Sequence, residues 1–578
     1  MGKGKRVLTK ESNKKRRLTR KEVEIKKRKI KKCFLTILAI IILAIIAMIV
    51  NDFVIIDNNK TTNLIINNKN VTSSLKQKVL IEDDIIYLSK QDISNFFDKY
   101  IYQDEKTEKI VTTYDKKIAE IGFDENEINI NGSDKQISAH AIEKDGQIYL
   151  PISEMTDVYN IEISDIKESN IVTMDSLERE QKRAIVNSNC AVKASSNFIA
   201  KTVDRVKKGD AVIVVSSDKG YTKIRTANGK LGIIKTNKIE NEFLIRENMD
   251  EEKQISGKVN LTWDYYSEYV NAPNREGTTI DGINVVSPAF FYLDANGDLK
   301  ENIGDSGKAY IKWAKNNRCK IWPMVSNGVA ANKSLNITSN IMNDYEKRKK
   351  LIESIVNKCV EYELDGINID FENMKSEDKD MYSRFIIELE PRLKEIGMVL
   401  SVDVTAPDGG DTWSMCFDRH VIGNVADYTI FMAYDQNGSS STKPGTTAGY
   451  NWVKLNLVKF LQTEEINPNK LILAVPLYTR IWTTNSDGKV ISNNSLSIKN
   501  TEAAIPDGIT KQWNDELKQN YVTFSSGNNT KQIWIEDIDS LKAKISLMKE
   551  NNLAGIASWE ANMAYDDIWT MFKNELNN

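Results

Sequence analysis

The chain has 578 residues, a length that predicts about three or four domains rather than one compact core. Hydrophobic residues make up 41% of it and charged residues 28%, which argues against a wholly disordered chain and a polytopic membrane protein. The net charge is −2, and two histidines with five cysteines in no C-x-x-C pair argue against zinc, a three-histidine metal centre and a disulfide framework, which leaves carboxylates as the expected chemical groups.

The first part of the chain combines a basic arm with an apolar run. Residues 1–32 hold sixteen Lys or Arg and three Glu, and residues 33–50 follow as eighteen residues without a charge. That run is long enough to span a bilayer, and the positive-inside rule keeps the arm cytoplasmic, so we expect a single-pass signal anchor in the cell membrane with the rest of the chain outside. A cleaved signal peptide is the alternative, but no A-x-A site follows the run. Nucleic acid is not an expected partner, because the arm leads directly into the apolar run.

Residues 61–177 contain a loose internal repeat. Residues 86–89 (IYLS) and 148–151 (IYLP) lie 62 residues apart, and each precedes a short helical pattern and a further strand pattern. The two halves predict one small α+β domain, which resembles the amino-terminal domain of copper amine oxidases. Copper is not expected, because the region has one histidine, His140, and no cysteine. The alternatives that stay open are a spacer and a module that contacts the cell wall.

Residues 183–241 consist of short β-rich runs separated by glycines. Asn228-Gly229 marks a hairpin turn, and the segment predicts a small β-barrel. It resembles the bacterial Src-homology-3-like domains of wall hydrolases in its Gly209, Tyr221 and Gly229 pattern. The resemblance implies binding of peptide stems, and a structural spacer is the alternative.

Residues 250–578 alternate short apolar runs with longer amphipathic stretches. Eight such runs over about 320 residues predict an α/β fold, the (β/α)8 or TIM barrel, whose active site lies at the carboxyl ends of the strands. The runs are 259–263, 282–287, 320–325, 366–371, 399–404, 428–433, 471–475 and 555–559.

The fourth run carries the most polar side chains. Because strand residues alternate between two faces, Asn368, Asp370 and Glu372 are expected to project together into the barrel. Burial of two carboxylates is unfavourable unless they form hydrogen bonds or do chemistry, so a purely structural role is the weaker interpretation. Burial and the charge of Asp370 raise the pKa of Glu372, as a general acid requires.

The segment 365–372 (DGINIDFE) resembles the D-x-x-D-x-D-x-E signature of glycoside hydrolase family 18. Residues 432–435 (MAYD) are similar to the family's M-x-Y-D motif, and residues 475–482 (VPLYTRIW) are similar to its seventh-strand segment. Trp559 resembles the eighth-strand tryptophan beneath the sugar. The matches occur in the family's order at the expected strand ends.

The resemblance implies substrate-assisted hydrolysis with retention of configuration, without a metal or cofactor. Glu372 is the implied general acid, Asp370 orients the substrate's 2-acetamido group, and Tyr434 donates a hydrogen bond to its carbonyl oxygen. The further expected substrate contacts are Asn368, Met432, Asp435, Arg480, Trp559, Tyr478, Trp482, Trp263 and Trp322, of which the last four are equally compatible with the core.

One position departs from the family pattern, because Asn368 stands where the middle Asp is usual. An amide there can still hydrogen-bond Asp370, and the pH optimum is left open. Asn368 and its surroundings resemble the spore-cortex-lytic branch, which implies an N-acetylglucosaminidase acting on peptidoglycan. A chitinase and a non-catalytic glycan-binding scaffold are the alternatives, and the sequence leaves internal or terminal cleavage and oligomeric state open.

Overall fold

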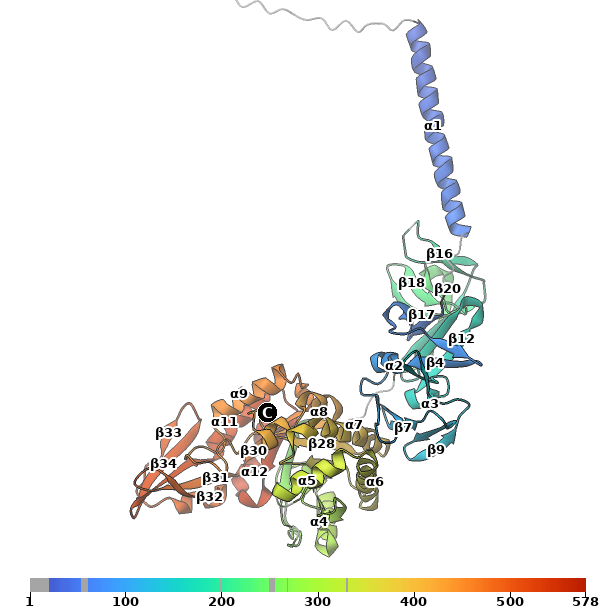
Figure 1. The fold of residues 1–578 in the computed structure, drawn as a ribbon. Coiled ribbons are helices and arrows are strands. Elements are labelled where there is room, and N and C mark those ends of the chain that lie inside the picture. The colour runs from blue at the N-terminus through green and yellow to red at the C-terminus, as the bar shows by residue number, and fades with distance from the viewer. Residues whose placement is uncertain are drawn as a thin grey trace, which may run out of the picture. The chain divides into compact units, whose positions relative to one another are not determined.

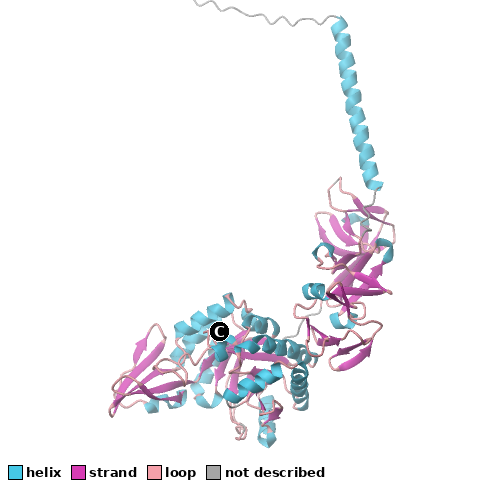
Figure 2. Cartoon of the chain, in the orientation of Figure 1, coloured by secondary structure: helices cyan, strands magenta, loops and turns pink. Residues whose placement is uncertain are grey.

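The computed structural model describes residues 20–53, 61–197, 199–248, 255–267, 269–328 and 331–577. The chain forms two compact units, one of Met1–Val79 with Asn160–Asp250 and one of Leu80–Tyr159 with Glu251–Asn578. The predicted 61–177 domain is therefore divided between the two units. Figure 2 shows short strands in most of the chain between the first helix and the last domain.

Helix α1 (Arg20–Phe53) includes the whole predicted apolar run 33–50. Residues 1–19 of the basic arm, and the side chains of residues 44, 45 and 47–50, lie outside the described residues. Within the described part of the chain, no helix combines the length and the apolar character needed to cross a membrane.

The first unit contains two sheets. A four-stranded sheet has the order β12-β13-β1-β2, in which β1 and β13 are parallel. A seven-stranded antiparallel sheet has the order β16-β15-β19-β18-β17-β14-β20, and its β18–β19 hairpin turns at Gly229, which has a φ of 73°. The strands are β1 (Asn63–Ile66), β2 (Lys69–Asn70), β12 (Ile161–Ile166), β13 (Ile171–Ser176), β14 (Gln181–Val186), β15 (Cys190–Lys193), β16 (Thr202–Val206), β17 (Ala211–Asp218), β18 (Tyr221–Arg225), β19 (Leu231–Lys235) and β20 (Ile239–Arg246).

The Leu80–Tyr159 part of the second unit contains the two copies of the sequence repeat. The copies lie in β4 and β11, which pair with each other through Leu88 and Leu150, and a short helix, α2 or α3, follows each. Two sheets have the orders β10-β11-β4-β3 and β5-β6-β7-β8-β9. The elements are β3 (Leu80–Glu82), β4 (Ile85–Ser89), α2 (Lys90–Phe96), β5 (Tyr102–Gln103), β6 (Ile110–Tyr114), β7 (Lys117–Ile121), β8 (Glu127–Ile130), β9 (Ser133–Gln136), β10 (Ile142–Lys144), β11 (Gln147–Leu150) and α3 (Thr156–Tyr159).

Polar contacts explain why the 61–177 region is divided. In the first unit, Arg225 of β18 forms a buried two-point ion pair with Asp175 of β13. In the second, Tyr102 donates to Glu388 (3.0 Å) and Lys349 pairs with Glu120 (2.5 Å), which joins β5 and β7 to two barrel helices. These partners are far apart in sequence, so the internal repeat gives no sign of them.

The second unit also contains the predicted (β/α)8 barrel. Its parallel strands pair in sequence order, and β36 pairs with both β30 and β21, which closes the ring. β23 (Phe291–Leu293) and β26 (Met324–Ser326) extend the second and third strands on the same sheet. All eight predicted runs coincide with strands: β21 (Val259–Asp264), β22 (Val285–Pro288), β25 (Lys320–Ile321), β27 (Gly366–Asp370), β28 (Val399–Val404), β29 (Tyr428–Met432), β30 (Leu471–Pro476) and β36 (Gly555–Trp559).

Helices follow the strands and cover the barrel (Figure 1). Their apolar faces bury residues such as Leu351 and Ile355 of α6 against the strands, and Asp344 caps α6 by accepting from the Lys347 N–H. The helices are α4 (Gly304–Asn316), α5 (Ala331–Met342), α6 (Tyr345–Glu361), α7 (Lys379–Glu395), α8 (Arg419–Val425), α9 (Tyr450–Gln462), α11 (Ile538–Glu550) and α12 (Asp566–Asn577).

A five-stranded antiparallel sheet is inserted between the seventh and eighth barrel strands, with the order β32-β31-β35-β34-β33. The sequence analysis did not predict this sheet. Its β31 begins two residues after β30 and therefore carries side chains to the carboxyl end of the barrel. Its elements are β31 (Tyr478–Thr484), β32 (Val490–Ser497), α10 (Ile498–Thr501), β33 (Gln512–Asn514), β34 (Gln519–Ser526) and β35 (Asn529–Ile535).

Candidate active site

The predicted acid, Glu372, lies just beyond the carboxyl end of β27. The side chain of Asn327, which follows β26, fixes its backbone: Asn327 Oδ1 accepts from the Glu372 N–H (3.0 Å), and Asn327 Nδ2 donates to the Glu372 carbonyl oxygen (2.8 Å). Asn327 is itself buried and donates to Thr338 (2.9 Å). Glu372 therefore sits on a backbone segment that is held from the neighbouring strand, an arrangement that the sequence analysis missed.

Asp370 and Glu372 are partly buried and act on each other's protonation. Burial raises the pKa of both carboxyl groups, and the charges of Asp370 and Asp435 raise the pKa of Glu372 further. A hydrogen bond between the two side chains raises the pKa of Glu372 and lowers that of Asp370. The pKa of Asp370 is raised to about 6 and that of Glu372 is raised well above its usual value, so at neutral pH the shifts favour a proton on Glu372 and a charge on Asp370.

One oxygen of Asp370 lacks a hydrogen-bond donor. Asp370 Oδ1 is buried, and no donor from the described residues contacts it. A buried acceptor without a donor costs roughly 1–3 kcal/mol, so such atoms are rare in folded proteins. An N–H group of a ligand at the strand ends would satisfy this oxygen.

Asp435 is placed by two residues of the inserted sheet. Tyr478 donates to Asp435 Oδ1 (2.7 Å), and the Arg480 guanidinium lies 3.5 Å from the same oxygen. Asp435 has a φ of 57°, which turns the chain sharply after β29 and Tyr434. Burial, with the charges of Asp403 and Asp370, raises the pKa of Tyr434 well above its usual value, so its hydroxyl remains a donor.

Trp559 is partly exposed at the end of β36. Its ring lies 5.7 Å from the ring of Trp263 and 5.5 Å from that of Tyr265, the latter being exposed. An apolar ring that is partly open at the carboxyl end of a barrel strand suits the face of a sugar. Tyr265 was not predicted from the sequence.

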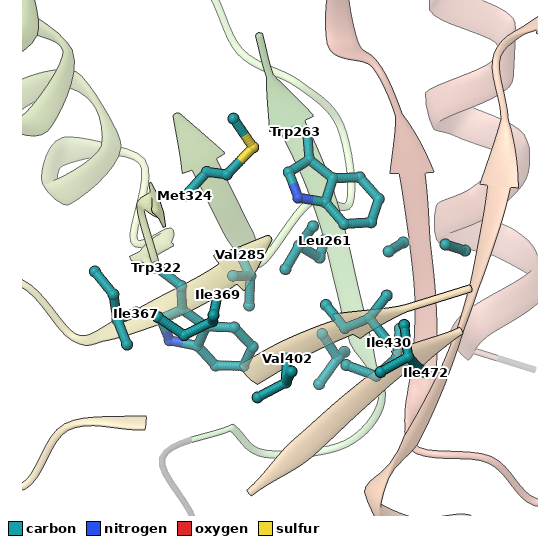
Figure 3. Packing of buried hydrophobic residues seen from close by; sticks show 14 of the residues in the cluster. Leu261, Trp263, Val285, Trp322, Met324, Ile367, Ile369, Val402, Ile430 and Ile472 are labelled. Carbon is teal, nitrogen blue, oxygen red and sulfur yellow. The ribbon is translucent and has the colours of Figure 1, made fainter. Parts of the chain in front are cut away.

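Four predicted substrate contacts are enclosed by protein. Trp322 and Trp482 are 0% exposed. Trp322 lies among buried apolar residues such as Ile367 and Ile369 (Figure 3) and stacks on Tyr428, and Trp482 donates to the Gly445 carbonyl oxygen (2.9 Å). Trp263 is also buried, and Met432 is 4% exposed. For the three tryptophans the structure favours the core interpretation, because none of them presents a ring face to solvent.

Asn368 requires a correction. It is 0% exposed, and both of its N–H groups are used, by Ser401 Oγ (3.1 Å) and Asp403 Oδ1 (2.9 Å). Asn368 therefore does not form the hydrogen bond to Asp370 that the sequence analysis considered. It also does not reach a substrate. Its small neighbour Gly366 is required because a Cβ there would lie 2.6 Å from the Val399 carbonyl oxygen.

Asp403 is the carboxylate that the sequence analysis did not select. It lies on β28, is 1% exposed, and has its pKa raised well above the usual range by burial and by the charge of Asp370. Besides Asp435, the site thus contains Asp370, Glu372 and Asp403, and none of these three forms an ion pair with a basic residue in the described part of the chain.

Comparison with known proteins agrees with this geometry. The model of the family "Glycosyl hydrolases family 18" matches residues 261–564, and that of "Copper amine oxidase N-terminal domain" matches residues 65–174. The second match supports the predicted amino-terminal module.

Several Bacillus proteins are similar to the barrel. The uncharacterized glycosylase YvbX of Bacillus subtilis is 28% identical over 299 residues, which cover 50% of this chain and 83% of YvbX. The cortical fragment-lytic enzyme of B. subtilis is 24% identical over 247 residues, which cover 41% of this chain and 56% of that enzyme.

A solved structure, the spore cortex-lytic enzyme SleL of Bacillus megaterium, is 19% identical with a TM-score of 0.48, covering 64% of this chain and 89% of SleL. The family match extends over more than half of the chain, and it includes seven of the barrel strands in full, β21 from Leu261 onward and every candidate catalytic residue. The chain therefore belongs to glycosyl hydrolase family 18, and it is a glycosidase.

Proposed function

We propose that the protein hydrolyses β-1,4 bonds next to N-acetylglucosamine in peptidoglycan, by a retaining mechanism in which the substrate's own acetamido group is the nucleophile. The supporting features are the raised pKa of Glu372, the neighbouring Asp370, and the partly exposed Trp559 at the carboxyl end of the barrel strand β36.

In the first step, Glu372 donates its proton to the glycosidic oxygen as the bond between that oxygen and the anomeric carbon breaks. The acetamido carbonyl oxygen attacks the anomeric carbon and closes an oxazolinium ring. Asp370 accepts a hydrogen bond from the acetamido N–H and offsets the positive charge of the ring, and the Tyr434 hydroxyl donates to the acetamido oxygen. The leaving sugar departs with the proton of Glu372.

In the second step, the Glu372 carboxylate takes a proton from water, and the resulting hydroxide oxygen bonds to the anomeric carbon. The ring opens, the acetamide is restored, and Glu372 regains its proton. Two displacements at the same carbon retain its configuration, and neither step uses an enzyme nucleophile.

The unsatisfied Oδ1 of Asp370 is the observation that carries this proposal. A carboxylate oxygen without a donor, on the last residue of β27, is suited to accept a hydrogen bond from a substrate N–H. An N-acetylated sugar supplies that N–H next to the anomeric carbon. A sugar without the acetamido group supplies neither the donor nor the nucleophile.

Peptidoglycan is proposed as the substrate because two similar proteins carry the names cortical fragment-lytic enzyme and spore cortex-lytic enzyme. The test is mass spectrometry of the products from purified cortex and vegetative peptidoglycan, beside chitin oligomers. We expect new N-acetylglucosamine reducing ends from peptidoglycan. Hydrolysis of chitin alone would make the protein a chitinase, and no hydrolysis of either would leave a glycan-binding scaffold.

We further propose that the chain is held at the cell membrane with the barrel outside. The support is the sequence, in which a basic arm of residues 1–32 is followed by the apolar run 33–50. The test is protease treatment of intact protoplasts. Loss of the barrel with retention of a short membrane fragment is expected, and full protection of the barrel would contradict the proposal.

A further inference from the structure

Asp403 lies directly beside Asp370 inside the barrel. The parallel register of β27 and β28 places Asn368 opposite Ser401 and Ile369 opposite Val402, so the next positions, Asp370 and Asp403, are neighbours. Asp403 is on the same face as Ser401, whose hydroxyl contacts Asn368 (3.1 Å). The mechanism proposed above gives Asp403 no role, although it is a buried carboxyl group next to the group that meets the substrate.

The hydrogen-bond network fixes the orientation of Asn368 toward Asp403. Trp263 Nε1 donates to Asn368 Oδ1 (2.9 Å), and an indole N–H can only donate. Ser287 Oγ lies 3.3 Å from the same oxygen. The Asn368 amide nitrogen must therefore face Ser401 and Asp403, and it donates to Asp403 Oδ1 at 2.9 Å. One oxygen of Asp403 thus receives a fixed N–H.

The groups that face Asp403 from the surrounding elements are acidic or neutral. Asp370 and Glu372 face it from β27 and the segment that follows, Tyr434 faces it from the end of β29, and Tyr382 faces it from α7. Arg419 of α8 lies near the end of β28 but donates to the carbonyl oxygens of Thr405 and Ala406. No basic residue in the described part of the chain forms a salt bridge with Asp403.

Three carboxyl groups in such a site cannot all be ionised, because each negative charge opposes the next and burial disfavours every one of them. Glu372 holds the proton that the reaction uses. If Asp403 were ionised, it would place a second anion beside Asp370 and raise the affinity of Asp370 for a proton. A neutral Asp403 leaves Asp370 as the single anion of the cluster.

We propose that Asp403 is a positioning residue that keeps its proton through the catalytic cycle, so that Asp370 stays ionised for the acetamido N–H and the oxazolinium charge. This inference rests on the proposed function and adds a requirement to it. The active form of the enzyme needs protons on both Glu372 and Asp403. Asn368 holds Asp403 in place by donating to Asp403 Oδ1, and the proton of Asp403 resides on its second carboxyl oxygen.

The test is the pH profile of kcat/KM for the full-length wild type and for Asp403→Asn. Asparagine has nearly the shape of a protonated aspartate, accepts from Asn368 and cannot ionise. We expect Asp403→Asn to keep activity within about threefold at neutral pH and to move the alkaline limb to higher pH by at least about 0.3 units when the two acids are equally strong. The shift arises because one of two groups that must stay protonated no longer titrates.

Two outcomes overturn the inference. An unchanged alkaline limb, together with a Tm difference between the two proteins that stays constant from pH 5 to pH 8, would mean that Asp403 has only a structural role. A limb moved to lower pH, or a loss of activity of more than tenfold at neutral pH, would mean that Asp403 acts as an anion. Thr429→Val on the neighbouring strand β29 is the matched control, because it also changes a buried polar side chain but removes no titrating group, and its pH limbs should not move.

A second measurement does not need catalysis and therefore separates this inference from the proposed function. If Asp403 is protonated in the folded protein and ionised in the unfolded chain, the Tm of Asp403→Asn should rise relative to that of the wild type between pH 5 and pH 8. A Tm difference that stays constant over this range would contradict a protonated Asp403, whether or not the protein hydrolyses peptidoglycan.

Discussion

Buried carboxylates occur in two regions of the barrel, and their partners differ. On the helical exterior, Glu388 accepts from Arg348 (3.1 Å) and Glu536 accepts from Lys544 (3.0 Å), with both members of each pair nearly fully buried. At the carboxyl ends of the strands, Asp264 pairs with Arg275 (2.6 Å) and Asp435 lies 3.5 Å from Arg480. Asp370, Glu372 and Asp403, however, have no basic partner among the described residues. The two exterior pairs compensate their charges, and the cluster of Asp370, Glu372 and Asp403 does not.

The paired carboxylates contribute to stability, and the unpaired carboxyl groups are suited to reactivity. Burial raises the pKa of Glu536, but Lys544 and Ser540 oppose that shift, so the pair holds its helix in place. Burial and neighbouring anions raise the pKa of Glu372 together, and its hydrogen bond to Asp370 adds to them. A carboxyl group in the second situation keeps a proton that it can give to a substrate.

The largest expected effect is on catalysis. Glu372→Gln keeps the size of the side chain but removes the proton donor, so the rate of peptidoglycan hydrolysis should fall about 10²- to 10⁴-fold. The release of reducing ends measures the rate, and thermal unfolding checks that the variant is folded. Hydrolysis at the wild-type rate would show that Glu372 is not the acid.

The second prediction concerns the compensated region. Arg348→Met leaves Glu388 buried without its ion-pair partner and should lower the free energy of unfolding by about 3–5 kcal/mol, with little change in kcat per folded molecule. Lys350→Met is the matched control on the same helix, because its pair with Asp298 is exposed and worth at most about 1 kcal/mol. Equal losses for the two variants would contradict the comparison.

The third prediction uses the sign of the pKa shift. The pKa of Glu372 is higher in the folded protein than in the unfolded chain. The stabilisation that its carboxyl group contributes is therefore fully present below the pKa of the unfolded chain, and it is lost as pH rises through the pKa of the folded protein. Glu372→Gln should therefore stabilise the protein more at pH 8 than at pH 4.5, by about 1 kcal/mol or more. Urea unfolding at both pH values measures this difference, and equal effects would argue against a raised pKa.

The smallest expected effect is at the contact between β5 and the barrel helices. Tyr102→Phe removes the hydroxyl that donates to Glu388 and accepts from Arg348 (2.8 Å), while the ring keeps its place 4.0 Å from the Arg384 guanidinium. A loss of about 1 kcal/mol in unfolding free energy is expected. An unchanged free energy would show that the Arg348–Glu388 pair needs no help from the tyrosine.

Much of the barrel was predictable because its strands are short apolar runs that helical segments separate. The alternation in 366–371 likewise placed Asn368 and Asp370 on the inner face. The same reasoning applied to 399–404 would have found Ser401 and Asp403, since they are the polar residues of an otherwise apolar run. That signal was present in the sequence and was not used.

Other features had no local signal. Asn327, at the end of β26, holds the backbone of Glu372 at the end of the neighbouring strand β27. An asparagine after a strand is common, so its sequence gives no sign of this contact. Trp322 follows a barrel strand and Trp482 lies on β31, positions at which a substrate-binding tryptophan could also occur. Only the packing of the structure shows that both rings are enclosed. The fixed contact of residues 80–159 with the barrel depends on pairs such as Lys349–Glu120, which are 229 residues apart.

The most direct test of the central claim is the alkaline limb of kcat/KM for the wild-type enzyme on soluble peptidoglycan fragments. A Glu372 that has anionic neighbours and no ion-pair partner among the described residues should remain protonated well above the usual glutamate pKa of about 4.3. Burial raises the pKa of Asp370 to about 6, so we expect the enzyme to be active at pH 7, where Asp370 is ionised. Activity that is lost between pH 4 and pH 5, as for an ordinary exposed carboxyl group, would contradict the account.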